Sequence, residues 1–149
     1  MSEHTAALSW SRHGRDFSYE TYSRDHELTF ENGQKSLASA ASDYFGNPEA
    51  LNPETLLVGA LASCHMLTFL AVCAKRGYIV ERYDDAAAGL LEKNAEGKMA
   101  ITRITLRPHA IFTGEKQPDT AELARLHERA HANCFIAASI RAGVEVLPR

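Results

Sequence analysis

The feature that most constrains this chain is its long apolar stretch, Thr55–Val72. The preceding Asn52-Pro53-Glu54 predicts a helix start, because Asn caps a helix, Pro suits its first position and an acid favours its positive end. Gly77 predicts the stop, so we expect one helix from residue 53 to about 76. Because this helix is apolar on nearly every face, we expect it to be buried all round. A chain of 149 residues can hardly surround it alone, which favours a dimer.

The same stretch approaches membrane-spanning length, but Ser63, Cys64, His65 and Thr68 lie around its middle. Lipid tolerates such polar groups poorly, so a buried core helix is favoured over a spanning one. Three cysteines without a secretory signal predict a reducing, cytoplasmic location. The net charge of -3, with scattered Lys and Arg, gives no reason to expect nucleic acid or a membrane as partner.

The rest of the sequence predicts one domain of residues 1–149, with a β-rich part at about 1–33 and a helical and hairpin part at about 52–149. In the first part we expect strands at Ala6–Ser11, Phe17–Ser23 and His26–Phe30, with turns at His13–Asp16 and Asn32-Gly33. Residues 34–51 are interpreted as a long surface loop that can include one helical turn. In the second part we expect a long β-hairpin from Tyr78–Leu91 and Met99–Phe112, a helix at Asp119–Ala132 and a strand at Val144–Leu147. The fold class is therefore α+β.

Three cysteines are the candidates for chemistry. Cys73 lies nine positions after Cys64, about 180° around the helix, and is interpreted as a small core residue. Cys64 and Cys134 could also be core residues, but each has a histidine near it, His65 or His131. A thiol becomes a nucleophile when it is held as thiolate, and a nearby Arg lowers its pKa by favouring that charge. The sequence does not show which groups converge, so both interpretations stay open.

A zinc site built from Cys64-His65 and His131-x-x-Cys134 is disfavoured, because adjacent residues on one helix point about 100° apart. We expect no metal and no other cofactor. The remaining histidines are interpreted as surface or strand residues; they are His4, His13, His26, His109 and His127.

Two blocks carry a resemblance to a known family. Asn52-Pro53-Glu54 with Ala60–Cys64, and then Ala130-His131-x-x-Cys134, together resemble the OsmC/Ohr family of osmotically inducible and organic hydroperoxide resistance proteins. The spacing of ten from Glu54 to Cys64, and a second thiol about seventy residues downstream, fit that family. The resemblance runs from Glu31 onward. It implies an OsmC-like fold in which two chains form an intertwined homodimer, with long central helices wrapped by antiparallel sheets.

The resemblance also implies thiol-dependent reduction of small organic hydroperoxides in oxidative-stress defence. Cys64 would attack the peroxide and become a sulfenic acid, and Cys134 would resolve it as a disulfide that a dithiol reductant reopens. Glu54 would orient an arginine that stabilises the thiolate, with Arg24 as the first candidate and Arg15 as the second. Apolar walls would favour alkyl peroxides, and we expect them to come from Leu56, Leu57, Leu61, Phe69 and Phe135.

In one straight helix Glu54 and Cys64 lie about 15 Å apart along the axis. Either the helix breaks near Gly59, or the Glu–Arg pair comes from the other subunit, which we favour. The chain also departs from the family: Phe135 follows Cys134 where its peroxidases usually have Pro, and His65 stands beside the first thiol. The alternative is therefore a non-peroxidase OsmC-like dimer that binds a small apolar or thiol-reactive ligand in the same pocket.

Overall fold

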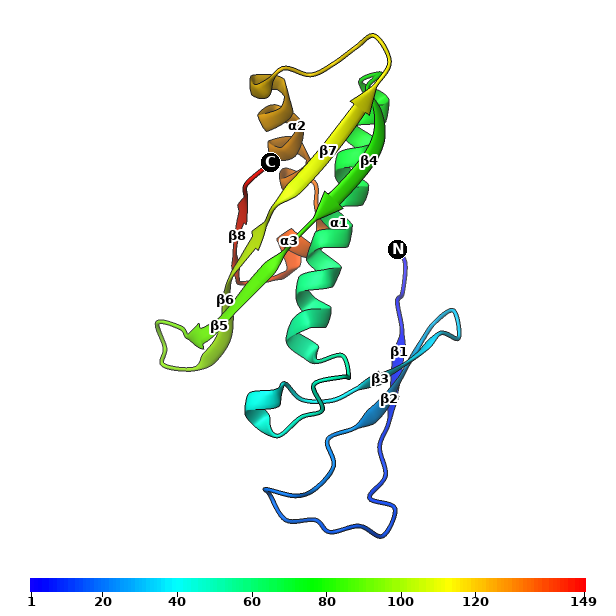
Figure 1. Cartoon of the computed structure of the whole chain (residues 1–149), viewed down its shortest axis with the longest axis vertical. Helices are drawn as coiled ribbons and strands as arrows, with labels where there is room; N and C mark the ends of the chain where they lie inside the picture. Colours follow the sequence, from blue (N-terminus) through cyan, green and yellow to red (C-terminus); the bar gives the residue numbers. More distant parts are fainter. The chain divides into compact units, whose positions relative to one another are not determined.

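The computed structural model describes all residues, 1–149, and they pack into two compact units, Met1–Leu56 and Leu57–Arg149. The first unit contains β1 (Ala6–Ser9), β2 (His26–Phe30), β3 (Lys35–Ala38) and the 3₁₀ turn η1 (Ser42–Tyr44). Helix α1 (Pro53–Lys75) begins just before the boundary and belongs mainly to the second unit. The other elements of that unit are β4 (Ile79–Asp85), β5 (Ala88–Lys93), β6 (Met99–Leu106), β7 (Pro108–Thr113), α2 (Thr120–Ala132), α3 (Phe135–Ser139) and β8 (Gly143–Val146) (Figure 1).

The first unit is an antiparallel sheet in the order β1-β2-β3. Gly33 lies at φ +81°, and its N–H donates to the carbonyl of Phe30 at 2.8 Å, so the predicted Asn-Gly turn joins β2 to β3. The turn predicted at His13–Asp16 is present, but the strand predicted at Phe17–Ser23 is wrong, so the turn joins no hairpin. Residues 17–23 form turns instead, because their aromatic rings gather around the side chain of Arg24. The segment 34–51 begins with a strand that is not predicted, β3, and then contains η1, which fits the helical turn expected in this loop.

Helix α1 starts and stops where the sequence predicts. The side chain of Asn52 accepts a hydrogen bond from the N–H of Thr55 at 2.8 Å, and Gly77 adopts φ +73° after the last turn. The helix continues through Gly59 without a break. Its buried residues form a single row, which consists of Leu61, His65, Phe69 and Cys73. The expectation of burial all round is therefore wrong for one copy of the chain. The other elements enclose that row and partly cover its neighbours, among them Leu57, Val58, Leu70 and Val72.

The second unit has two sheets. In one, β4 pairs with β7; in the other, β6 lies between antiparallel β5 and parallel β8. The long hairpin predicted from residues 78–112 is thus present but divided into two pairs of strands. The helix predicted at 119–132 and the final strand are confirmed, and the side chain of Asp119 caps α2 by accepting from Glu122 N.

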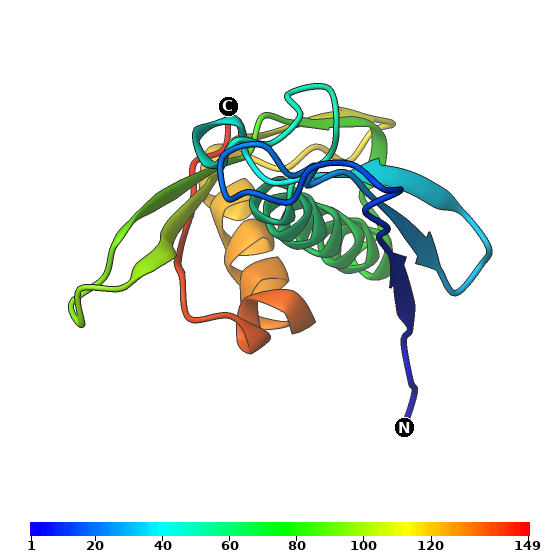
Figure 2. The same ribbon diagram turned by 90° about the horizontal axis from the view of Figure 1, so that it is seen from below.

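The core of the second unit consists of two clusters along α1, and α2 lies beside that helix (Figure 2). The first cluster is built around Leu61, Ile104, Leu106 and Cys134, and the second around Phe69, Cys73, Leu126 and Ala130. Cys73 is fully buried among apolar side chains, as the sequence predicts. The fold is α+β, in which one helix carries both clusters.

Candidate functional site

The structure brings two of the predicted site residues together, the thiols of Cys64 and Cys134. Cys64 lies in the middle of α1 and is half-buried, while Cys134 is buried and forms the N-cap of the short helix α3. Both are free thiols, and they lie close enough for each to shift the pKa of the other. They are brought together because α2 packs along α1 and the chain turns sharply at Asn133, directly before α3.

The surroundings move the pKa values of the two thiols in opposite directions. Burial by itself raises the pKa of Cys64, but hydrogen bonds from the backbone N–H of Ile136, the thiol of Cys134 and the backbone N–H of Phe135 outweigh it and lower that pKa. For Cys134, burial and then the bond with Cys64 raise the pKa. The hydroxyl of Thr68 uses its one proton on the carbonyl of Cys64 at 2.8 Å, so the two backbone donors and the thiol of Cys134 lower the pKa of Cys64. Of the two thiols, Cys64 is therefore the one that ionises more readily.

Cys64 lines an open groove of about 580 Å³. Two of its walls are unusually open for apolar side chains: Phe135 is 82% exposed and Leu67 is 60% exposed. The groove is lined by Ala60, Ser63, Cys64, Leu67, Thr68, Ala71, Asn133, Phe135 and Ile136. The expectation that Leu61 and Phe69 form its walls is wrong, because both belong to the buried row of α1 and are enclosed in the two core clusters.

Glu54 lies in the first turn of α1, ten residues before Cys64 in the same unbroken helix. The two side chains are therefore separated by about 15 Å along the axis and cannot act together within one helix. A helix break near Gly59 is excluded. Oε2 of Glu54 is buried and has no hydrogen-bond partner in one copy of the chain. A buried carboxylate oxygen needs a donor, and a cationic side chain would supply one.

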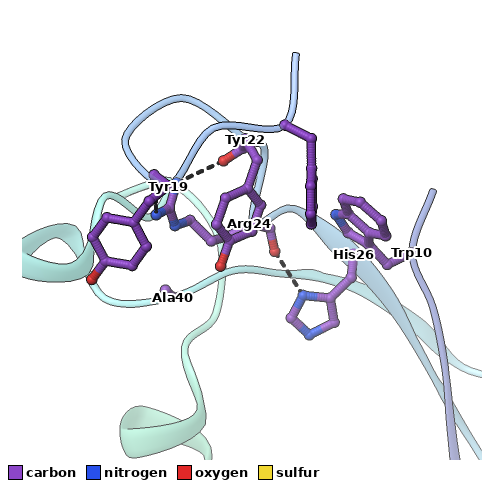
Figure 3. Close-up of a pocket in the computed structure, with 7 residues that line it drawn as sticks. Trp10, Tyr19, Tyr22, Arg24, His26 and Ala40 are labelled. Carbon is purple, nitrogen blue, oxygen red and sulfur yellow. Dashed lines mark hydrogen bonds between the residues drawn. The ribbon is translucent and has the colours of Figure 1, made fainter. Parts of the chain in front are cut away.

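Arg24 belongs to the first unit, where its half-buried guanidinium donates to the backbone carbonyls of Tyr19 and Tyr22 (Figure 3). The guanidinium carbon lies 3.9 Å from the centroid of the Tyr22 ring. No carboxylate lies within ion-pair distance of Arg24. Arg15, the second candidate, is exposed in the turn between β1 and β2.

A buried histidine pair joins α1 to α2, and the sequence does not predict it. Nε2 of His65 lies 3.1 Å from Nδ1 of His127, and the two rings stack with centroids 5.4 Å apart. The prediction that His127 is a surface residue is wrong, because it is only 3% exposed and stacks on Phe69. The helical spacing could have indicated this burial, because His127 is four residues after Leu123 and next to Leu126, on the apolar face of α2.

Burial keeps both imidazoles of this pair neutral. It lowers the pKa of His65 to about 4, with a further contribution from the charge of His131, and it lowers the pKa of His127 to about 4, with a contribution from His65. One ring nitrogen donates and the other accepts in the bond between them. The outer nitrogens, Nδ1 of His65 and Nε2 of His127, are buried without partners.

His127-Glu128-x-x-His131 has the spacing of the H-E-x-x-H motif of zinc proteases. In this structure, however, no group of three or more His, Cys, Asp or Glu side chains is arranged to hold a metal ion. Nδ1 of His127 bonds to His65, and Nε2 is enclosed rather than open to an ion. The motif therefore gives no argument for a metal centre here.

Comparisons with known proteins agree on one family. A family model described as OsmC-like protein matches residues 46–147. A solved structure of an OsmC-like protein of unknown function from Vibrio cholerae O1 biovar eltor is 42% identical, covers 100% of both chains and superposes with a TM-score of 0.95. The uncharacterized protein YmaD of Bacillus subtilis (strain 168) is 28% identical over 102 residues, which are 68% of this chain and 67% of YmaD. The organic hydroperoxide resistance protein OhrB of Bacillus subtilis shares the fold, with a TM-score of 0.72 at 16% identity over 99% of this chain and 98% of that one.

Proposed function

Since this chain belongs to the family of OsmC-like proteins, we propose that it is a thiol-dependent peroxidase that reduces small organic hydroperoxides in oxidative-stress defence. The observation that carries the proposal is the pair of neighbouring thiols, in which Cys64 has a lowered and Cys134 a raised pKa, beside an open apolar groove. A relative of the same fold, OhrB, is named an organic hydroperoxide resistance protein. We interpret residues 1–149 as one OsmC-like domain.

The chemistry follows from the two thiols. The thiolate of Cys64 attacks one peroxide oxygen, the O–O bond breaks, and the alkoxide leaves and takes up a proton to become an alcohol. Cys64 is then a sulfenic acid. The sulfur of Cys134 attacks it, an S–S bond replaces the S–O bond, and hydroxide leaves as water with the proton of Cys134. A dithiol reductant restores both thiols by disulfide exchange.

Phe135, which stands where the family's peroxidases usually have Pro, is compatible with this mechanism. Proline has no backbone N–H, whereas the N–H of Phe135 is one of the donors that lower the pKa of Cys64. The side chain of Phe135 also provides an exposed apolar wall for the organic part of the peroxide. Compared with proline, Phe135 therefore adds a backbone N–H that donates to Cys64, but it lacks the rigid ring of proline.

We place the active protein in an intertwined homodimer. One copy leaves a face of the apolar α1 open, where Leu67 is 60% exposed, and exposed apolar surface of this kind marks an interaction site. The helix is long and apolar enough to cross a membrane, but OsmC-like proteins are soluble and use it as a core helix. We propose that a second copy covers it, that Glu54 gains Arg24 as its partner across that contact, and that the dimer is cytoplasmic.

The test is stopped-flow oxidation of the reduced protein by an alkyl hydroperoxide. We expect fast formation of a Cys64–Cys134 disulfide in the wild type, no reaction in Cys64→Ser and arrest at sulfenic acid in Cys134→Ser. Cys73→Ser is the matched control and should react like the wild type, because Cys73 is a core residue. If the wild type reacts no faster than a free thiol, the peroxidase proposal fails. The groove would then belong to the alternative, an OsmC-like dimer that binds a small apolar or thiol-reactive ligand.

A further inference from the structure

The second unit contains a cleft between α2 and β8 that the proposed reaction does not use. Its volume is about 270 Å³, and it lies where β8 runs beside α2 (Figure 1). Liquid water takes about 30 Å³ per molecule, so the cleft has room for a ligand of several heavy atoms. It shares no lining residue with the groove at Cys64. The lining residues are Ala124, His127, Glu128, His131, Val144, Val146 and Pro148.

Three side chains of α2 bring hydrogen-bond acceptors to this cleft. His127 is only 3% exposed, and its Nε2 is buried without a hydrogen-bond partner. Nδ1 of His131, about one helical turn later, is also buried and unpartnered. Glu128 is exposed and forms no ion pair, because Arg125 donates to Glu122 instead. Buried polar atoms without partners cost free energy, so a ligand that supplies donors is favoured.

The histidine pair determines what Nε2 of His127 can do. When Nδ1 of His127 donates its proton to Nε2 of His65, 3.1 Å away, Nε2 of His127 carries a lone pair and accepts. Burial lowers the pKa of His127 to about 4, so this ring is neutral at pH 7 and keeps that lone pair. Glu128 adds a negative charge, and no Lys or Arg lines the cleft. The polar side of the cleft therefore favours a cation that carries N–H donors.

The other side of the cleft is apolar. Val144 and Val146 of β8 are half-buried there, and Pro148 follows them. A metal ion would leave this wall without a contact, and no three His, Cys, Asp or Glu side chains are arranged to hold one. A ligand with a cationic head and a short hydrocarbon body would use both sides.

We infer that this cleft binds a small primary alkylammonium ion, with its head among the acceptors of α2 and its alkyl body on the apolar wall of β8. An –NH₃⁺ group has three donors, one for each acceptor side chain, and its bond to Glu128 is charge-assisted. Neither thiol takes part. The inference therefore goes beyond the proposed function and stands or falls separately from it.

Isothermal titration calorimetry of the full-length protein near pH 7 tests this binding with isobutylammonium. Isobutanol has the same alkyl body without the charge, and isobutyltrimethylammonium keeps the charge without N–H donors. We expect saturable binding of isobutylammonium and affinities at least about tenfold lower for both comparators, since each loses charge-assisted hydrogen bonds. Absence of saturable binding of isobutylammonium, or equal binding of all three, overturns the inference.

Variants locate the site. Glu128→Gln should weaken the binding of isobutylammonium about tenfold or more, whereas Glu81→Gln, the same change at an exposed position on β4, should leave it unchanged. Ala124→Leu fills the cleft and should abolish binding, whereas Ala121→Leu makes the same change on α2 outside the lining and should not. Binding unaffected by Glu128→Gln or by Ala124→Leu refutes the site. Cys64→Ser should bind isobutylammonium like the wild type, whatever becomes of the peroxidase proposal.

Nitrogen-15 NMR of the histidine side chains provides a second readout. Isobutylammonium should shift the Nε2 signal of His127, because that atom gains a donor, and leave the exposed His13 of the first unit unchanged. Saturable binding without a change at His127 would contradict the assigned contact.

Discussion

Acid should destabilise this protein through the buried pair of His65 and His127. Burial holds the pKa of each at about 4 in the folded chain, whereas the ordinary value is 6.5. An unfolded chain exposes both imidazoles and takes up protons near the ordinary value, but the folded chain cannot. Because the folded pKa is the lower one, the stability that the neutral pair confers is present above pH 6.5 and is lost as the pH falls toward 4.

The size of the effect follows from the shifts. One pKa unit corresponds to about 1.4 kcal/mol, so a lowering from 6.5 to about 4 makes roughly 3 kcal/mol of folding free energy pH-dependent for each histidine. If both histidines titrate independently on unfolding, the free energy of unfolding falls by about 3 kcal/mol per pH unit within that window. Domains have only about 5–15 kcal/mol of stability in total, so unfolding near pH 5 is within reach.

Urea unfolding at a series of pH values between 7.5 and about 5 measures this slope. The double variant His65→Leu/His127→Phe removes both titrating groups, and its slope should be close to zero, while it keeps an aromatic ring against Phe69. The single variant His127→Phe should be the less stable of the two at pH 7, because it leaves Nε2 of His65 buried without a partner. Equal pH dependence in the wild type and the double variant would refute the reasoning.

Three further predictions concern single positions. Phe135→Pro should raise the pKa of Cys64 and slow its alkylation by iodoacetamide near neutral pH, because a backbone donor is lost, whereas Phe135→Ala keeps the donor and should leave the pKa unchanged. Gly46→Ala should lower the urea midpoint far more than Gly33→Ala. A Cβ at Gly46 would lie 1.6 Å from a backbone oxygen. A Cβ at Gly33 meets no atom, and the variant loses only the about 1 kcal/mol that a φ of +81° costs a residue with a side chain. Asp119→Ala should cost about 1 kcal/mol by removing the cap of α2, and Asp119→Asn should restore most of it in the same urea assay.

The sequence predicts elements whose signals are local. The cap at Asn52, the stop at Gly77 and the Asn-Gly turn each depend on a few neighbouring residues, and all three are present in the structure. The error at Phe17–Ser23 has a physical cause. Aromatic residues favour strands in general, but these rings pack around a guanidinium from the same loop, and no local pattern reveals that contact.

The candidate site shows the same division. Cys64 and Cys134 stand out by residue type and by resemblance to a family, and the structure brings them together. The histidine pair joins residues 62 positions apart, so no spacing rule connects them. The groove walls were assigned to the wrong face of α1, because a helix that is apolar all round gives no indication of which face is covered.

The buried row of α1 has a geometric consequence for the whole second unit. Its members recur every four residues, from Leu61 to Cys73, and each step of four advances about 40° beyond a full turn. The row therefore winds by about 120° along the helix. Leu61 faces the sheet that contains β6, and Phe69 faces the one that contains β4 and β7. The strands thus form two sheets because the buried row winds around α1 and meets a different sheet at each end. His65, which is bonded to His127, lies between Leu61 and Phe69 in this row.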